Sequence, residues 1–509
     1  MTVAIGSRLE ASDVVAVAGG APVSFGDDAR AKVASARVVI DDAVASGATI
    51  YGVTTGFGAL AHTRVDPAQA STLQHGIVRS HATAVGTPLP REEARAMLLL
   101  RAHVLALGHS GVRPEVVGLM VSMLNEDVIP AVPQQGSLGA SGDLAPLANL
   151  ALPLIGHGEV LAPEGGTEPA PAAMARAGLS SLTLEAKEGL ALVNGTQGML
   201  AIGILATERA ASLARTADVV AAMTIEASLG TDRPFDERLQ ALRPHPGQAA
   251  SAANLRRLLS SSPVLASHRE SAHLVQDAYS LRCAPQVHGA TRDALAYASG
   301  VLTIEMNSVS DNPIVLPDGG EVMSGGNFHG QPVAVALDTV ATALVSLASI
   351  SERRLYRLLD EHQSNGLPPF LVHGSGLNSG FMLVQYTAAS LVSECKSLAH
   401  PASVDSIPSS AGQEDHVSMG MTSARHAREV VSNAETVIAL EALAAAQALD
   451  LRAPLEPGPA TREVHGAIRA RVPFFEADRE FGPDIADAVS LVRQARLVAA
   501  AEAAIGPLD

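Results

Sequence analysis

The segment Gln135–Pro146 brings together residues whose types and spacing could do chemistry. It reads Gln-Gly-Ser-Leu-Gly-Ala-Ser-Gly-Asp-Leu-Ala-Pro, with three glycines within seven residues around the triplet Ala140-Ser141-Gly142. Because glycine permits positive φ and close backbone approach, the segment predicts a tightly bent loop. A phosphate-binding loop does not fit, since no Lys-Ser/Thr pair follows at the P-loop spacing and no Gly-x-Gly-x-x-Gly occurs.

Two further kinds of chemistry are conceivable for this loop, one at a side chain and one at the backbone. A nucleophile elbow at Ser141 does not fit, because Gly139–Asp143 lacks the last glycine of Gly-x-Ser-x-Gly. The backbone itself could react, since the Gly142 nitrogen could attack the Ala140 carbonyl if the chain bends tightly enough. Loss of water from the ring and from Ser141 would leave an exocyclic methylene, an electrophile that no ordinary side chain provides. An ordinary glycine-rich connection is the alternative.

Three polar residues elsewhere in the sequence could take part in chemistry with such an electrophile. Tyr51 opens the loop Tyr-Gly-Val-Thr-Thr-Gly-Phe-Gly, and its phenol, with a pKa of ~10, would need a helix N-terminus or a cation to act as a base near neutrality. Asn194 interrupts an apolar run and needs partners, because an unsatisfied buried amide costs ~1–3 kcal/mol; it could also cap a helix. His81 follows Ser80, and taken alone is a half-buried histidine with one hydrogen bond.

Two later segments carry charged residues of possible function. Arg282 has a planar guanidinium that can grip a carboxylate with two hydrogen bonds, although the nearby Asp277 could instead be a structural partner. Glu414 lies in Gln-Glu-Asp-His, which gives little support to metal ligation because no second histidine lies one helical turn away. The sequence therefore predicts no metal site.

All of these segments resemble motifs of the MIO-dependent aromatic amino-acid ammonia-lyases and aminomutases. The motifs occur in family order, and the resemblance runs from about Ser7 to the C-terminal region. It implies that Ala140, Ser141 and Gly142 cyclise autocatalytically to 4-methylideneimidazol-5-one (MIO). This cofactor is the family's electrophile.

The resemblance also implies roles for the other residues. Tyr51 would remove a proton from the β-carbon of the substrate, and Arg282 would anchor the amino-acid carboxylate. The expected catalytic residues are Tyr51, Ala140, Ser141, Gly142, Tyr279 and Glu414, and the expected substrate-binding residues are His81, Asn194, Gln276, Arg282, Asn312 and Phe328.

The pair Ser80-His81 and the segment around Glu414 resemble the histidine-specific members of the family. An imidazole needs polar partners, whereas a phenyl ring would leave a buried carboxylate unpaired. The expected reaction is therefore the deamination of L-histidine to trans-urocanate and ammonia, with His81 and Glu414 holding the imidazole.

At three places the sequence differs from the pattern of the family or of its histidine-specific members, and these differences leave alternative functions open. Histidine-specific members usually have Asn at the position of Gly412 and Ala-Glu at the position of Gly330-Gln331, and the family often has Met at the position of His288. A 2,3-aminomutase or a tyrosine or phenylalanine ammonia-lyase is the nearest alternative. A catalytically inactive helical scaffold is an alternative of another class.

The elements that must position these residues are predominantly helical. Four stretches beyond residue 200 lack Gly and Pro: 204–229, 333–365, 381–400 and 421–453. In the second, aliphatic residues recur every three or four positions, which predicts a helix with one apolar face, ~50 Å long. By resemblance the fold is all-α and of the fumarase/aspartase type, with a lobe at 1–200 that carries the MIO loop, a long-helix bundle with a C-terminal helical region at 201–509, and a homotetramer with shared active sites.

Composition excludes several other classes. The formal net charge of −17 gives no basic surface for nucleic acid or an anionic membrane. Cys283 and Cys395 make no disulfide framework, and the first residues lack a signal-peptide pattern, so we expect a cytoplasmic enzyme. The uncharged stretch 189–207 could span a bilayer by length, but its four glycines favour a buried core segment, and no transmembrane helix is predicted.

Overall fold

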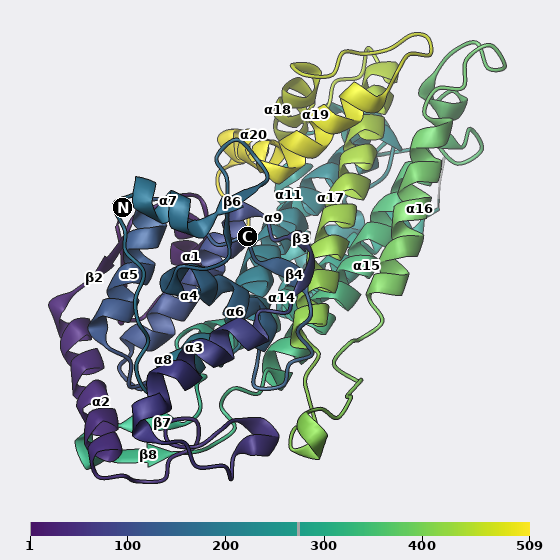
Figure 1. The fold of residues 1–509 in the computed structure, drawn as a ribbon. Helices are drawn as coiled ribbons and strands as arrows, with labels where there is room; N and C mark the ends of the chain where they lie inside the picture. The colour runs from purple at the N-terminus through teal and green to yellow at the C-terminus, as the bar shows by residue number, and fades with distance from the viewer. Residues whose placement is uncertain (1, 272–274) are drawn as a thin grey trace. The chain divides into compact units, whose positions relative to one another are not determined.

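The computed structural model of the chain describes residues 2–271 and 275–509. Helices dominate it, and the described strands are short and paired in twos (Figure 1). The all-α class expected from the sequence is confirmed. The pairs are β1 (Val3–Ile5) with β2 (Val23–Phe25), parallel, and, antiparallel, β3 (Val85–Pro88) with β4 (Pro133–Gln135), β5 (Glu159–Leu161) with β6 (Thr167–Pro169), and β7 (Ile314–Leu316) with β8 (Glu321–Met323).

The chain forms two compact units that are not contiguous in sequence. Unit 1 comprises Met1–Leu205, Ser299–Asp338 and Pro401–Arg425, and unit 2 comprises the remaining segments. The sequence-based division at residue 200 lies close to the first boundary between the units, but it did not anticipate that two later segments join unit 1. Four of the five boundaries lie within helices, namely α9 (Gln197–Ala227), α14 (Ala284–Met306), α15 (Gln331–Leu359) and α17 (Gly420–Leu451), and the boundary at 400/401 lies between helices.

Unit 1 is organised around one buried helix, α4 (Arg91–Ala106). Its residues from Glu93 to Ala106 are all buried, and it packs against helices α1 and α5. A helix without an exposed face must lie at the centre of its layer. The other helices of this unit are α1 (Ala11–Ala18), α2 (Asp27–Ala45), α3 (Ala70–His81), α5 (Pro114–Asn125), α6 (Leu144–Ala151), α7 (Ala170–Arg176) and α8 (Glu188–Val193).

Unit 2 takes in most of the glycine-free stretches. The helices predicted over 204–229, 333–365, 381–400 and 421–453 are observed as α9, α15, α16 (Met382–Leu398) and α17, with ends within about seven residues of those predicted. The remaining helices of this unit are α10 (Glu237–Ala241), α11 (Pro246–Leu258), α12 (Pro263–Ser267), α13 (Tyr279–Arg282), α18 (Pro459–Arg469), α19 (Gly482–Arg493) and α20 (Arg496–Ile505).

The apolar face predicted for α15 is buried. Val340, Leu344, Leu347, Leu355 and Leu358 have no exposed surface. By length and composition α15 could cross a membrane, and 61% of its most apolar window is buried inside the protein. The stretch 189–207 is divided instead, because α8 ends at Val193 and α9 begins at Gln197.

A fully buried ion pair joins α15 to α17 within unit 2. Arg354 donates from Nε and Nη2 to the two carboxylate oxygens of Glu441, at 2.5 and 2.8 Å. The hydroxyl groups of Thr224 and Ser351 donate to the same carboxylate, at 2.7 and 2.6 Å. Each oxygen of Glu441 therefore accepts hydrogen bonds from both an arginine and a hydroxyl group.

We expect Arg354→Met to lower the free energy of unfolding by about 3–5 kcal/mol, because it leaves the Glu441 carboxylate buried without its counter-ion. Urea unfolding followed by circular dichroism measures the change. The control is Arg176→Met, which breaks the exposed pair with Glu168 and should barely move the unfolding midpoint. Equal decreases in the free energy of unfolding for the two substitutions would contradict the stabilising role of the buried pair Arg354–Glu441.

Candidate active site

The segment 139–142 forms the tight bend that its glycines predicted. Ser141 and Gly142 both have positive φ, of 52° and 76°, and the Gly139 and Gly142 backbones pair as an isolated antiparallel bridge. Gly142 also pairs with Gly195, and a Cβ placed on Gly142 would lie 2.0 Å from the Gly195 carbonyl oxygen. Only glycine therefore fits at position 142. The positive φ values and the two backbone bridges fold the triplet Ala140-Ser141-Gly142 back on itself and hold it there.

Asp143 anchors the end of this bend. It is fully buried and accepts hydrogen bonds from the Ser137 hydroxyl at 2.9 Å and from the Met199 amide at 2.8 Å. Burial raises its pKa to about 6, although both hydrogen bonds oppose the shift. Its own amide donates to the Gly195 carbonyl at 2.7 Å, so the bend is bonded to the start of α9 through side chain and backbone alike.

Asn194 ends α8 and is almost completely buried, with the partners that its apolar surroundings required. Its Nδ2 donates to Asp311 Oδ1 at 3.0 Å and to the Asn312 carbonyl at 3.1 Å. Arg101 donates to its carbonyl at 2.7 Å. Asn194 occupies the C-cap position of α8 and also lines a cavity with Ser141, so the capping role and the site role occur together.

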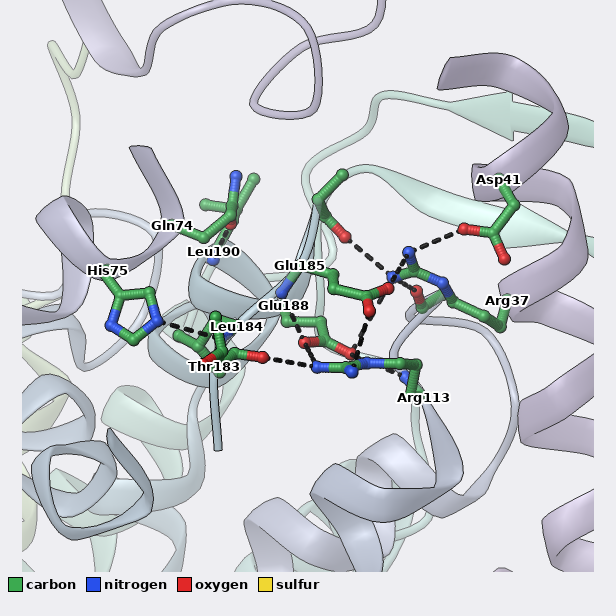
Figure 2. Close-up of polar contacts among 12 residues, drawn as sticks. Arg37, Asp41, Gln74, His75, Arg113, Thr183, Leu184, Glu185, Glu188 and Leu190 are labelled. Atoms are coloured by element: carbon green, nitrogen blue, oxygen red, sulfur yellow. Dashed lines mark hydrogen bonds and ion pairs between the residues drawn. The ribbon is translucent and has the colours of Figure 1, made fainter. Parts of the chain in front are cut away.

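Buried charges support α8 from behind. Lys187 pairs with Asp311 at 2.8 Å, and both side chains are fully buried. Glu188 is also fully buried, and Arg113 donates to its carboxylate from Nε and Nη2, both at 2.8 Å (Figure 2). Helix α8 has only six residues, so its position depends on these ionic contacts more than on its own backbone hydrogen bonds.

Tyr51 lies in the loop that its glycines predicted. Its hydroxyl oxygen accepts a hydrogen bond from the Gly58 amide at 3.0 Å. Burial raises the pKa of Tyr51 above its usual value, the Gly58 amide opposes the shift, and the negative charge of Glu414 adds to it. The sequence had suggested that a cation or a helix N-terminus could lower this pKa, but within unit 1 the balance of these groups acts in the opposite direction.

His81 and Glu414 line the same cavity. His81 is the last residue of α3, and its Nδ1 lies 3.0 Å from the Ser80 hydroxyl. Burial lowers the pKa of His81, partly offset by the charge of Glu414, so its imidazole is neutral near pH 7. Glu414 follows the turn η7 (Ser410–Gly412), and the Ser409 hydroxyl donates to its Oε2 at 2.7 Å.

Two neighbouring cavities of unit 1 contain most of the predicted residues. The larger, of about 840 Å³, is lined by the hydrophobic side chains of Leu73, Ile77, Leu144 and Leu190 together with polar residues. The second, of about 390 Å³, shares several residues with the first and adds Ala140 and Phe328. Predicted residues that line one or both cavities are Tyr51, His81, Ala140, Ser141, Asn194, Asn312, Phe328 and Glu414. Gly142 lines a third pocket, together with His81 and Glu414.

The three remaining predicted residues belong to unit 2. Tyr279 begins α13 and is 71% exposed. Arg282 lies over its ring, with the guanidinium carbon 4.7 Å from the ring centroid. The Nε of Arg282 is buried and has no hydrogen-bond partner among the described residues. Gln276 lines a separate small pocket of this unit.

Two of the sequence departures have local explanations. Gly412 has a φ of 87°, in the left-handed region that Gly and Asn tolerate best, so the exchange preserves the backbone. A Cβ on Gly330 would lie 2.5 Å from the sulfur of Met199, so the missing methyl group accommodates that side chain. His288 lies in unit 2, where its Nδ1 is 2.7 Å from the Asp218 carboxylate inside a buried network.

Several supporting residues were missed by the sequence reasoning. Arg101, Lys187 and Asp311 lie behind the site as buried charges, and their only signal is a charged residue inside an apolar or turn-forming segment. Burial lowers the pKa of Arg101 to about 10, with Asp311 opposing the shift. Among the residues that the structure describes, no group of three His, Cys, Asp or Glu side chains could hold a metal ion.

Comparisons with known proteins agree with the geometry. A family model described as aromatic amino acid lyase matches residues 9–470. A histidine ammonia-lyase of Sorangium cellulosum is 54% identical over 99% of this chain and 100% of its own length. The crystal structure of histidine ammonia-lyase from Trypanosoma cruzi has a TM-score of 0.92 at 43% identity, covering 99% of this chain and 96% of that one.

A tyrosine aminomutase from Streptomyces globisporus is also similar, with a TM-score of 0.94 at 40% identity and complete coverage of both chains. The fold is therefore shared by lyases and aminomutases, and the overall likeness does not separate the two reactions. The family match covers most of the chain and includes the bent loop, the Tyr51 loop and the segment of Glu414. The chain therefore belongs to the aromatic amino acid lyase family.

Proposed function

We propose that this enzyme is a histidine ammonia-lyase, which converts L-histidine to trans-urocanate and ammonia. The observation that carries the proposal is the joint presence of Ser141, Tyr51, His81 and Glu414 on the wall of one cavity. Relatives at 54% identity over nearly the whole chain bear this name.

The cofactor proposed for this site is MIO, formed from Ala140, Ser141 and Gly142. The backbone fits such a ring, because the positive φ values at Ser141 and Gly142 fold the triplet back and Gly195 occupies the space that a Cβ would need. When formed, MIO supplies an electrophile for the amino group of the substrate. Asp143 and Gly195 would hold the bend during cyclisation.

The side chain of the substrate is proposed to lie between His81 and Glu414. A neutral His81 imidazole can accept or donate one hydrogen bond at its Nε2, while its Nδ1 faces the Ser80 hydroxyl. Glu414 is oriented by Ser409 and can accept a hydrogen bond from a ring N–H. A charged acceptor selects an imidazole over a phenyl ring, because the phenyl ring would desolvate the carboxylate without a partner.

Tyr51 is proposed to take the β-proton of the substrate at its hydroxyl oxygen. In unit 1 its pKa is raised, so a cation that approaches with the substrate or from another part of the assembly would promote its ionisation. Asn194, Asn312 and Phe328 would shape the cavity around the reacting carbon atoms.

Arg282 is proposed to bind the carboxylate of the amino acid, with Gln276 and Tyr279 beside it. The exposed ring of Tyr279 is available for a ligand or another subunit, and the buried Nε of Arg282 has no hydrogen-bond partner among the described residues. We propose a homotetramer in which these residues complete the active site of a neighbouring subunit. A cytoplasmic location is also proposed, in keeping with two free cysteines.

We expect urocanate to form from L-histidine, and no cinnamate or coumarate from L-phenylalanine or L-tyrosine. Near-ultraviolet absorbance of the conjugated acid measures all three, and chromatography detects β-amino acids. Formation of a β-amino acid would show a 2,3-aminomutase instead, and the absence of any product would favour an inactive scaffold.

The variant Glu414→Gln is the specific control for this substrate assignment. The amide oxygen of Gln can still accept from a ring N–H but carries no charge, which reduces a hydrogen bond worth ~1.5–3 kcal/mol to one worth ~0.5–1.5 kcal/mol, so kcat/KM for L-histidine should fall by about 10-fold. An unchanged kcat/KM would contradict the proposed contact of Glu414 with the imidazole.

We expect Ser141→Ala to lose nearly all turnover, because it removes the hydroxyl group whose loss creates the methylene. Intact-protein mass spectrometry should show the wild-type protein lighter than its sequence mass by two water molecules, and no second dehydration in the variant. Full turnover by Ser141→Ala would disprove the MIO proposal.

We expect mixed tetramers of Ser141→Ala and Arg282→Met to recover part of the wild-type activity. Each variant alone has a defect in every site, whereas sites shared between subunits can combine an intact Ser141 with an intact Arg282. Co-expression with two affinity tags isolates the mixed species. No activity in mixed tetramers of wild-type-like stability would contradict shared sites.

A further inference from the structure

Gln74 uses both ends of its side-chain amide to join two walls of the cavity. It lies on α3, its side chain is fully buried, and it is not part of the cavity lining. Its Nε2 donates to the Gly52 carbonyl at 3.1 Å, and its Oε1 accepts from the Leu190 amide at 3.0 Å (Figure 2 labels Gln74 and Leu190). The amide therefore bridges the Tyr51 loop and α8.

Each of these bonds acts next to a residue of the proposed site. Gly52 directly follows Tyr51 in the chain. Leu190 lies one helical turn before Asn194, and its carbonyl accepts the Asn194 amide at 3.1 Å. Movement at either end of the Gln74 amide would therefore be passed to Tyr51 or to Asn194.

The packing around this bridge leaves little freedom for adjustment. A Cβ on Gly52 would lie 2.4 Å from the Leu190 side chain, and a Cβ on Gly189 would lie 2.2 Å from the Gln74 carbonyl oxygen. Gly189 therefore brings the backbone of α8 against that of α3, and Gly52 brings the backbone of the loop against the Leu190 side chain. The two hydrogen bonds of Gln74 act across these close contacts and fix the distance from the loop to α8 through α3.

Helix α3 carries a third wall of the same cavity. His81 lies seven residues after Gln74 and hence on the same face of the helix, two turns along. The single helix α3 therefore presents His81 directly and holds the Tyr51 loop and α8 through one amide.

We propose that Gln74 is a positioning residue that sets Tyr51 and Asn194 at their working distances from His81. The inference rests on the proposed ammonia-lyase function, which it deepens by adding a residue that touches neither substrate nor cofactor. An amide suits this role because it combines one neutral donor and one neutral acceptor at a fixed separation. A carboxylate lacks the donor, and an aliphatic or thioether side chain lacks both.

The first test compares Gln74→Met with the wild type. Methionine keeps the length of the side chain but makes neither bond, and a displacement of about 1 Å at a reacting group can cost ~100-fold. We expect kcat to fall by about 10- to 100-fold, with a much smaller change in KM, because the Gln74 amide does not bond to His81, Glu414 or Arg282, which are proposed to bind the ring and the carboxylate of the substrate. A fall in thermal stability without a fall in kcat would overturn the proposal.

The second test uses Gln74→Glu and pH. An ionised Glu can accept from the Leu190 amide but repels the Gly52 carbonyl, whereas a protonated Glu can donate to that carbonyl. Burial raises the pKa of a carboxyl group, so protonation should begin well above pH 4. We expect the ratio of variant to wild-type kcat to rise as pH falls, and a ratio that does not change with pH would overturn the proposal.

His75 offers a matched control on the same helix. Its Nε2 accepts from the Leu184 amide at 3.0 Å, which ties α3 to the segment before α8 without touching the Tyr51 loop (Figure 2). His75→Phe removes one side-chain bond of similar length. We expect wild-type kcat and an unchanged pH profile from this variant, even where its stability is lower.

Hydrogen–deuterium exchange tests the bridge made by the Gln74 amide independently of turnover. We expect residues 48–60 to exchange faster in Gln74→Met than in the wild type or in His75→Phe. Identical exchange in all three proteins would overturn the proposed bridge. If the wild type forms no urocanate while the exchange differs as expected, the proposed function is wrong and the structural role of the Gln74 bridge is confirmed.

Discussion

The backbone pairing of the 141–143 segment with Gly195 is the constraint on which the rest of the site depends. The Gly195 amide donates to the Ser141 carbonyl at 3.1 Å, and the Asp143 amide donates to the Gly195 carbonyl at 2.7 Å. No side chain can lie between these strands, because a Cβ on Gly142 would be 2.0 Å from the Gly195 oxygen. This contact holds the triplet Ala140-Ser141-Gly142 in its bend and places it beside Asn194.

Buried charge keeps that contact rigid. Lys187, Glu188, Asp311 and Arg101 surround α8 and its end, and each is fully buried with at least one charged or polar partner. Desolvating these groups is costly, and removing one partner would leave the other unpaired. The arrangement therefore favours a single position of α8 rather than a range of positions, which suits a wall that must hold catalytic groups to within about 0.5 Å.

In the cavity of unit 1 the surroundings favour the neutral forms of His81 and Tyr51, which lie near the acidic residue Glu414. Burial lowers the pKa of His81 and raises that of Tyr51, and the charge of Glu414 acts on both. A cationic or partly cationic substrate ring would be attracted to Glu414. The arginine that the motifs assign to the substrate carboxylate, Arg282, belongs to unit 2, whereas Ala140–Gly142, Tyr51, His81 and Glu414 all belong to unit 1.

The sequence by itself determined the all-α class and the positions of the long helices, and it named the candidate site residues. These features depend on local signals: the three- and four-residue spacing in α15, and the glycines that force the bends at Tyr51 and at Ala140–Gly142. The resemblance supplied the roles. Its motifs are contiguous segments, and each can be recognised in the sequence without knowing which residues pack against it in the folded protein.

Only the tertiary structure decided which distant residues support those motifs. Arg101, Lys187 and Asp311 meet behind Asn194 from segments up to about two hundred residues apart, and nothing in their local sequence marks a partner. The same is true of Gln74, whose two hydrogen bonds join segments more than a hundred residues apart. The membership of 299–338 and 401–425 in unit 1 was hidden for the same reason. Local patterns report which face of an element is apolar, whereas long-range polar contacts depend on how the elements pack, which local periodicity does not specify.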